Sequence, residues 1–111
     1  MKIVKVNRYG IYFDNGSEIT SSFDQCCCEY NYAEFEYLND DKICLNTNFK
    51  EPLVFEKTGD YGFRFGNKPN KMFFVPCYSE QNGCYDNSLR ILYNDKIVLD
   101  EVEAEMIDER D

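Results

Sequence analysis

The residues of this chain best suited to catalysis or metal binding are its six cysteines, because a thiolate can attack a substrate or hold a metal ion. They are Cys26, Cys27, Cys28, Cys44, Cys77 and Cys84. The chain has no histidine, so a Cys–His nucleophile pair cannot form within it. A helix start near residue 24 would favour a thiolate there, but the carboxylates of Asp24 and Glu29 oppose it. We therefore expect no catalytic residue and no enzyme activity.

Two structural interpretations of the cysteines stay open. Cys77 and Cys84 are separated by six residues and could bind zinc together with two of the three consecutive cysteines. Neither group has the C-x₂₋₄-C spacing of structural zinc sites, and adjacent cysteines are poor ligands for a tetrahedral ion. Free cysteine is also among the most buried residue types. We expect core thiols, with no metal and no cofactor.

The N-terminal sequence indicates a cytoplasmic protein. Charged residues interrupt the apolar ones over residues 1–8, so the hydrophobic stretch of a secretory signal is missing. Apolar runs also stay well short of the roughly 18 residues that span a bilayer. In a reducing cytosol the cysteines remain thiols. We expect no membrane partner.

Acidic residues gather in two segments of the sequence. The formal net charge is −9, and residues 24–41 contain six acids and no lysine or arginine. Residues 100–111 contain seven acids and one arginine. This excess of carboxylates argues against affinity for phosphate backbones, so we expect no direct nucleic-acid binding. Lying together, the two segments would attract a basic protein surface; the alternative is a solvated helix face and a soluble tail.

Tyrosines near these acids complete a candidate partner-binding surface, because an exposed tyrosine brings a large contact area with few torsions. We expect the partner to contact Glu29, Glu34, Glu36, Asp40, Asp41, Tyr30, Tyr37, Glu101 and Glu105. In the alternative interpretation the tyrosine rings pack and only their hydroxyls reach water.

A second candidate site is a small-ligand pocket. In it, a guanidinium and backbone amides would meet an anion while tyrosines stack on a base. Its residues would be Cys27, Cys28, Glu29, Arg64, Tyr78, Gln81, Asn82 and Tyr85.

One helix is expected to carry the first acidic segment, over roughly residues 24–38. Cys28, Tyr32, Phe35 and Leu38 fall at spacings of four, three and three, as on one stripe of a helix. Capping residues precede this stretch at residues 21–24, and the polar residues 39–41 end it.

Short strands are expected around this helix. Alternating or β-branched runs occur at residues 2–6, 11–13, 17–20, 43–45, 53–55, 61–65, 72–75, 89–93 and 96–99. Asn15-Gly16 and Asn94-Asp95 predict hairpins, and such short connections favour antiparallel pairing. We predict an α+β fold, a mostly antiparallel sheet of about six to eight strands with one main helix packed on one face. Residues 1–99 would form this single domain, and residues 100–111 an acidic tail or short helix.

Three stretches of the sequence carry a recognisable set of motifs. They are Phe13-Asp14-Asn15-Gly16 through Cys27-Cys28-Glu29 to Tyr32-Ala33-Glu34-Phe35, then Tyr61-Gly62-Phe63-Arg64, and then Val75-Pro76-Cys77-Tyr78 with Gln81-Asn82-Gly83-Cys84-Tyr85. Over residues 9–93 this resembles an uncharacterised family of small bacterial and phage domains. In such relatives a histidine often precedes Cys-Cys-Glu, whereas this chain has Ser22-Phe23-Asp24-Gln25, which puts a shared metal role in doubt. The resemblance implies a phage or mobile-element gene and no particular activity.

The leading hypothesis is a non-enzymatic acidic interaction protein that blocks a basic, nucleic-acid-binding surface of a host or defence protein. The alternative is a small-ligand or nucleotide-binding domain that sequesters its ligand in a pocket around Cys28, Arg64 and Tyr85. Neither hypothesis specifies an oligomeric state.

Overall fold

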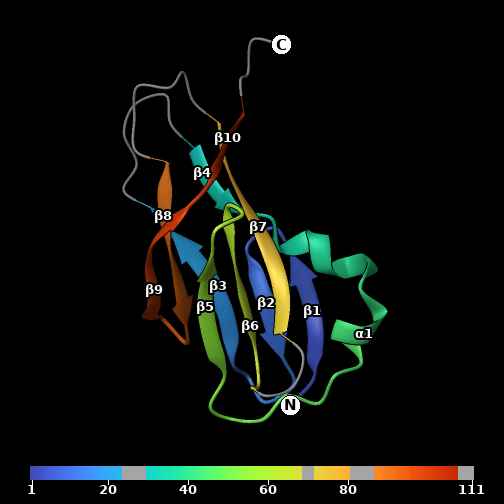
Figure 1. Ribbon diagram of the computed structural model, residues 1–111. Coiled ribbons are helices and arrows are strands. Elements are labelled where there is room, and N and C mark those ends of the chain that lie inside the picture. The colour runs from blue at the N-terminus through green and yellow to red at the C-terminus, as the bar shows by residue number, and fades with distance from the viewer. Residues whose placement is uncertain (24–29, 69–71, 81–86, 108–111) are drawn as a thin grey trace.

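The computed structural model describes residues 1–23, 30–68, 72–80 and 87–107, and this part of the chain is mainly strand (Figure 1). The strands are β1 Ile3–Asn7, β2 Gly10–Phe13, β3 Glu18–Ser22, β4 Tyr30–Ala33, β5 Val54–Thr58, β6 Gly62–Gly66, β7 Met72–Glu80, β8 Ser88–Tyr93, β9 Lys96–Glu103 and β10 Glu105–Ile107. A 3₁₀ helix, η1 Phe35–Asp40, and a one-turn α-helix, α1 Lys42–Leu45, follow β4. Within these ranges, no helix has the length and apolar character that crossing a membrane requires.

Two sheets of five strands account for the strands in the described residues. The first is antiparallel throughout and has the order β1-β2-β3-β8-β9. In the second, β5 pairs with β6, and β6 pairs with the first half of β7. The second half of β7 pairs with β4 and, in parallel, with β10. Because β4 and β10 both pair with Tyr78–Glu80, they lie at opposite edges of that half of β7.

The predicted α+β fold is wrong, because the protein is mostly antiparallel β and no main helix packs on a sheet in the part of the chain that the structure describes. Residues 24–29 of the predicted helix lie outside the described residues, and Tyr30–Ala33 form β4. The pairing of these residues with β7 outweighs the helical spacing of the apolar residues. Tyrosine also favours strands over other structures. The spacing of three between Phe35 and Leu38 is kept, because residues three apart align in a 3₁₀ helix and both side chains are buried.

Both predicted hairpins are confirmed. Gly16 has φ +89 in the loop between β2 and β3, and Asn94 and Asp95 both have positive φ between β8 and β9. The strand expected at residues 43–45 is wrong, because α1 occupies this segment. Its N-terminus is capped by the Asp41 carboxylate, whose Oδ1 accepts from the Cys44 N–H at 3.0 Å. Residues 100–103 belong to β9 and residues 105–107 to β10.

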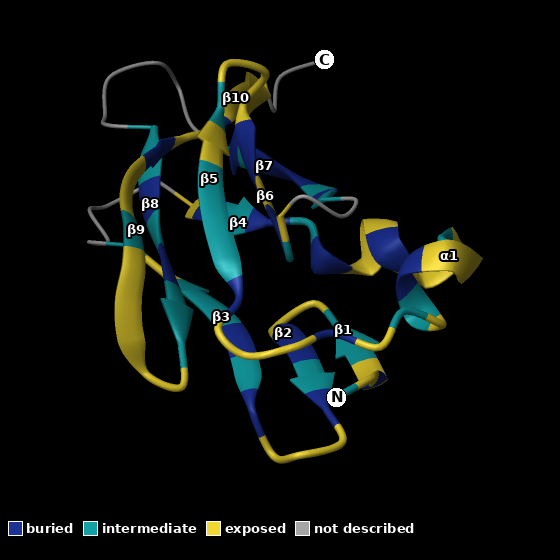
Figure 2. Cartoon of the chain, turned by 60° about the horizontal axis from the view of Figure 1, so that its bottom comes forward, coloured by how far each residue is buried: buried dark blue, intermediate teal, exposed yellow. Residues whose placement is uncertain are grey.

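Side chains from both sheets form one buried core. Ile11 and Ile91 of the first sheet and Phe63 and Val75 of the second are fully buried in the same cluster. The Phe49 ring joins the sheets, because its centroid lies 5.7 Å from that of Phe13 on β2 and 5.6 Å from that of Phe65 on β6. Exposed residues dominate β9 and much of α1, on either side of this core (Figure 2). The two sheets are therefore fixed as one scaffold.

Candidate functional site

The outer side of β4, β7 and β10 brings tyrosines and carboxylates together. Cys77 and Ser79 of β7 are fully buried, so the alternate residues Tyr78 and Glu80 face outward. Pairing places Tyr32 and Glu105 beside Tyr78, and Tyr30 beside Glu80. We call this surface, made of Tyr30, Tyr32, Tyr78, Glu80 and Glu105, the tyrosine face.

The rings of the tyrosine face contact one another in a row. Tyr30 stacks on Tyr32 with centroids 5.2 Å apart, and Tyr32 contacts Tyr78 at 5.8 Å. Phe23 meets the outer end of the row, edge-on to Tyr30 at 5.9 Å. Tyr30 nevertheless remains 51% exposed. The row is thus held by its own packing and still offers aromatic area to a partner.

A buried polar pair beneath the tyrosine face sets its orientation. The Ser79 hydroxyl donates to the Asn31 amide oxygen, and the Asn31 Nδ2 donates to the backbone carbonyl of Ser88 at 2.9 Å. Asn31 and Ser79 lie on the inward side of β4 and β7, one residue away from the tyrosines. A slip of one residue would bury Tyr30 and Tyr32 and break this pair, so the pair favours the observed register.

The carboxylates near the tyrosine face act on the hydroxyl of Tyr32. The pKa of Tyr32 is raised, first by partial burial and then by the nearby charges of Glu80 and Glu34. Within the described residues, neither Glu80 nor Glu105 forms an ion pair with lysine or arginine. The face therefore presents negative charge that this part of the chain leaves unneutralised.

The short helices continue the acidic surface beside the second sheet. The Tyr37 ring on η1 is 55% exposed and contacts the Phe74 ring of β7 at 6.4 Å. A shallow groove next to it is lined by Tyr37, Asp40, Asp41, Lys42 and Ile43. Exposed apolar and acidic groups thus alternate along this edge.

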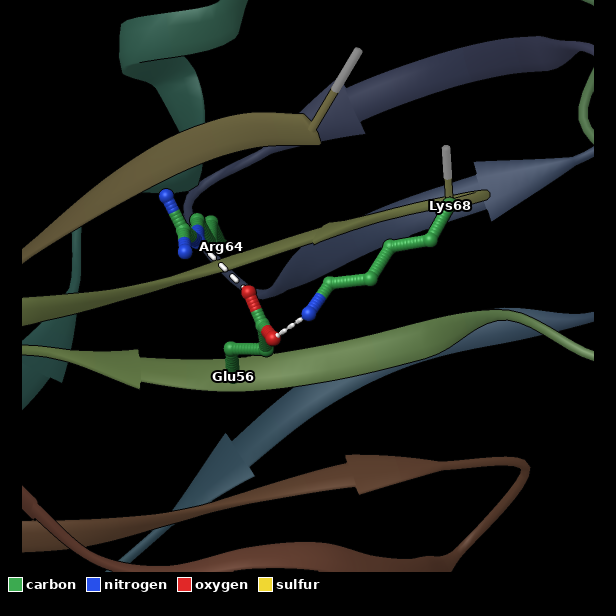
Figure 3. A network of polar contacts seen from close by, with 3 residues as sticks. All are labelled: Glu56, Arg64 and Lys68. Carbon is green, nitrogen blue, oxygen red and sulfur yellow. Dashed lines mark hydrogen bonds and ion pairs between the residues drawn. The ribbon is translucent and has the colours of Figure 1, made fainter. Parts of the chain in front are cut away.

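At the other end of the second sheet, one carboxylate pairs with two cations (Figure 3). The Glu56 carboxylate on β5 accepts from the Arg64 Nε at 2.7 Å and also contacts the Lys68 ammonium. These two cations, Lys68 first and then Arg64, lower the pKa of Glu56. We call Glu56, Arg64 and Lys68 the charge triad.

The structure divides the predicted partner-binding residues among three places. Tyr30 and Glu105 belong to the tyrosine face, with Glu34 close to it. Glu36, Tyr37, Asp40 and Asp41 lie on or beside η1. Glu101 is on β9, at the opposite edge of the first sheet from β1, which η1 contacts, as Figure 1 shows. Glu29 lies outside the described residues.

Only two residues of the predicted ligand pocket lie within the described part of the chain. Arg64 is on β6 in the charge triad, and Tyr78 is on β7 in the tyrosine face. Arg64 pairs with Phe74, four residues before Tyr78 along β7, so the structure does not bring the two together. The other members, Cys27, Cys28, Glu29, Gln81, Asn82 and Tyr85, lie outside the described residues.

Two of the cysteines are core thiols, as predicted. Cys44 and Cys77 are fully buried in the core cluster. Burial raises the pKa of the Cys77 thiol to about 12, which disfavours the thiolate that zinc binding or nucleophilic attack would need. Cys26, Cys27, Cys28 and Cys84 lie outside the described residues.

Sequence reasoning missed Glu80 and did not include Tyr32 in the partner-binding set. The available signal was alternation: Tyr30 and Tyr32 are two residues apart, as are Tyr78 and Glu80. Only the pairing of β4 with β7 places these two short patterns on the same surface.

Comparison of the chain with protein-family models, with curated proteins and with solved structures finds no match. The resemblance to small phage and bacterial domains therefore stays a prediction.

Proposed function

We propose that this chain is a non-enzymatic, cytoplasmic interaction protein that binds a basic, nucleic-acid-binding surface of another protein through its tyrosine face. The observation that carries the proposal is the position of Glu80 and Glu105 beside a row of tyrosines that ends in the half-exposed Tyr30, with no ion pair to a cation of the described residues. Tyrosine is enriched at interaction hot spots, and its ring can anchor a partner once water is displaced.

The overall charge supports the same proposal. A net charge of −9 steers a basic partner toward the protein and speeds association at low salt. The tyrosine rings would then slow dissociation, because their contacts are apolar and insensitive to salt. A partner that binds nucleic acid presents the required cations, and its occupied groove would be closed to phosphate backbones. The phage-like motifs make a host or defence protein the expected partner.

The test is affinity capture from a bacterial lysate at two salt concentrations, one near 50 mM and one near 300 mM. Wild type is compared with Glu80→Gln/Glu105→Gln and with a matched control, Glu56→Gln/Glu103→Gln. Both doubles change the net charge equally, but Glu56 is in the charge triad and Glu103 is exposed on β9.

We expect wild type and the control to capture a basic nucleic-acid-binding protein at low salt, and the tyrosine-face double to capture much less. Adding purified wild type to that partner should release its nucleic acid. Equal capture by both doubles, or a captured partner that keeps its nucleic acid, would contradict the proposal.

A further inference from the structure

We infer that the tyrosine face recognises an arginine-bearing segment of its partner, with a guanidinium group stacked on Tyr30 and paired with Glu80 and Glu105. This inference rests on the proposed function, because it names the part of a basic surface that the face would contact.

The chemistry of the face fits a guanidinium better than an ammonium group. A guanidinium is planar, so it can stack on a tyrosine ring while its fork of N–H donors pairs with a carboxylate. Tyr30 stands directly across from Glu80, and Tyr32 is on the same rung as Tyr78 and Glu105. Strand neighbours are about 4.8 Å apart, so each ring has a carboxylate within one or two strand spacings.

The protein already contains this kind of contact next to the tyrosine face. The Arg8 guanidinium lies 4.9 Å from the centroid of the Tyr9 ring, and its Nη2 donates to the Tyr9 hydroxyl at 2.7 Å. The pKa of Arg8 is raised chiefly by Tyr9, with smaller effects from the nearby Tyr30 and Glu36. An exposed tyrosine in this neighbourhood therefore contacts a guanidinium with both its ring and its hydroxyl.

The stacking of the rings decides which tyrosine a partner can reach. Tyr30 and Tyr32 project from the same side of β4, and their ring centroids are 5.2 Å apart. The Tyr32 ring therefore lies between those of Tyr30 and Tyr78, whereas Tyr30 remains 51% exposed. A guanidinium of the partner would thus stack on Tyr30.

The test is a fluorescence-anisotropy titration of the full chain with two labelled peptides, one alternating arginine and serine and the other alternating lysine and serine, of equal length and charge. Wild type should bind the arginine peptide about twofold to fivefold more tightly than the lysine peptide, the range that cation–π stacking supplies at an exposed site. Tyr30→Leu should abolish this preference, and Tyr30→Phe should keep it, which separates loss of the ring from loss of the fold.

Equal affinity of wild type for the two peptides would overturn the inference, as would a preference that survives in Tyr30→Leu. The double variant Glu80→Gln/Glu105→Gln distinguishes this failure from failure of the proposed function. If it weakens both peptides equally while wild type shows no arginine preference, only the inference fails. If the double variant binds both peptides as tightly as wild type does, the tyrosine face is not the binding surface and the proposed function fails as well.

Discussion

The two ends of the second sheet use charge in opposite ways. At the charge triad, one carboxylate contacts both Arg64 and Lys68, so the cations are already occupied. On the tyrosine face, Glu80 and Glu105 lie among aromatic rings, with no ion pair to the cations of the described residues. The same β7 strand contributes to both ends. Charge paired within the chain stabilises it modestly, whereas unpaired charge is available to a partner.

The inward sides beneath the two ends differ as well. Below the charge triad, the rings of Phe49, Phe65 and Phe73 pack together with centroids 5.6 to 6.2 Å apart. Below the tyrosine face lies the hydrogen-bonded pair of Asn31 and Ser79. An apolar cluster contributes more to stability, while a buried hydrogen bond specifies register. The end that we propose to face a partner is therefore expected to be the less stable and the more precisely positioned one.

A substitution in the apolar cluster below the charge triad should give the largest effect on stability. Phe65→Ala removes a fully buried ring between Phe49 and Phe73 and should lower the free energy of unfolding by about 3–5 kcal/mol. Urea denaturation measures this loss. Phe55→Ala, on the same rung of the sheet but only partly buried, should cost less. Equal losses would show that the packing below the triad is not the stable part of the sheet.

A substitution in the buried polar pair below the tyrosine face should give the next largest effect on stability. Asn31→Ala removes the bonds to the Ser79 hydroxyl and the Ser88 carbonyl and should cost about 1–3 kcal/mol of unfolding free energy. It should also weaken binding of a basic peptide, because the register of β4 is less firmly held. Asn39→Ala, at an exposed site on η1, is the control and should change neither quantity. If Asn31→Ala is destabilised but binds the peptide as tightly as wild type, the register of β4 does not determine recognition.

The outward charges should give a smaller, selective effect. Glu80→Gln should weaken binding of a basic peptide about twofold to fivefold at low salt, the range for an exposed ion pair. Glu56→Gln changes the net charge by the same amount but should weaken it less, because Glu56 is already paired. Isothermal titration at two salt concentrations provides the comparison. A larger loss in Glu56→Gln would reverse the roles assigned to the two ends.

The stability that the charge triad contributes should depend on pH. The folded state lowers the pKa of Glu56, so the stability contributed by this carboxylate is present above its unfolded pKa and is lost as pH falls through the folded value. At pH 7 the urea midpoint of wild type should be slightly higher than that of Glu56→Gln. This difference should vanish in acid and become smaller in high salt. A difference that does not shrink at all as the pH is lowered would have another origin.

The smallest effect is spectroscopic. Burial and the charges of Glu80 and Glu34 raise the pKa of Tyr32, so its stabilising neutral form is favoured to higher pH than in the unfolded chain and is lost as pH rises through the folded pKa. In a ¹³C NMR titration, Glu80→Gln should move the Tyr32 transition to lower pH, while Glu56→Gln should leave it in place. No movement in Glu80→Gln would remove Glu80 from the surroundings of Tyr32.

Local turn chemistry was predictable, and long-range placement was not. Asn94-Asp95 predicted a hairpin because its tight turn needs positive φ, which these residues adopt. The helix predicted over residues 24–38 is wrong at residues 30–33, because a strand of four residues is too short for alternation to outweigh a helical stripe. Pairing with β7 decides the matter, and this pairing involves residues more than 40 positions away.

The candidate surface was predictable only in part, for the same reason. Aromatic and acidic composition identified Tyr30 and Glu105. Glu101 is four residues from Glu105, but the chain has φ +52 at Glu101 and passes from the first sheet to the second at the buried Ala104. No local pattern marks this change of sheet, so composition grouped two residues that the fold separates.

The most direct test of the central claim is chemical-shift mapping of the ¹⁵N-labelled protein during titration with the arginine–serine peptide. We predict that the largest amide shifts occur in β4, in the second half of β7 and in β10, and that shifts on β5 and β9 are small. Shifts centred on β9 or on the charge triad, or no saturable shifts at low salt, would contradict the account.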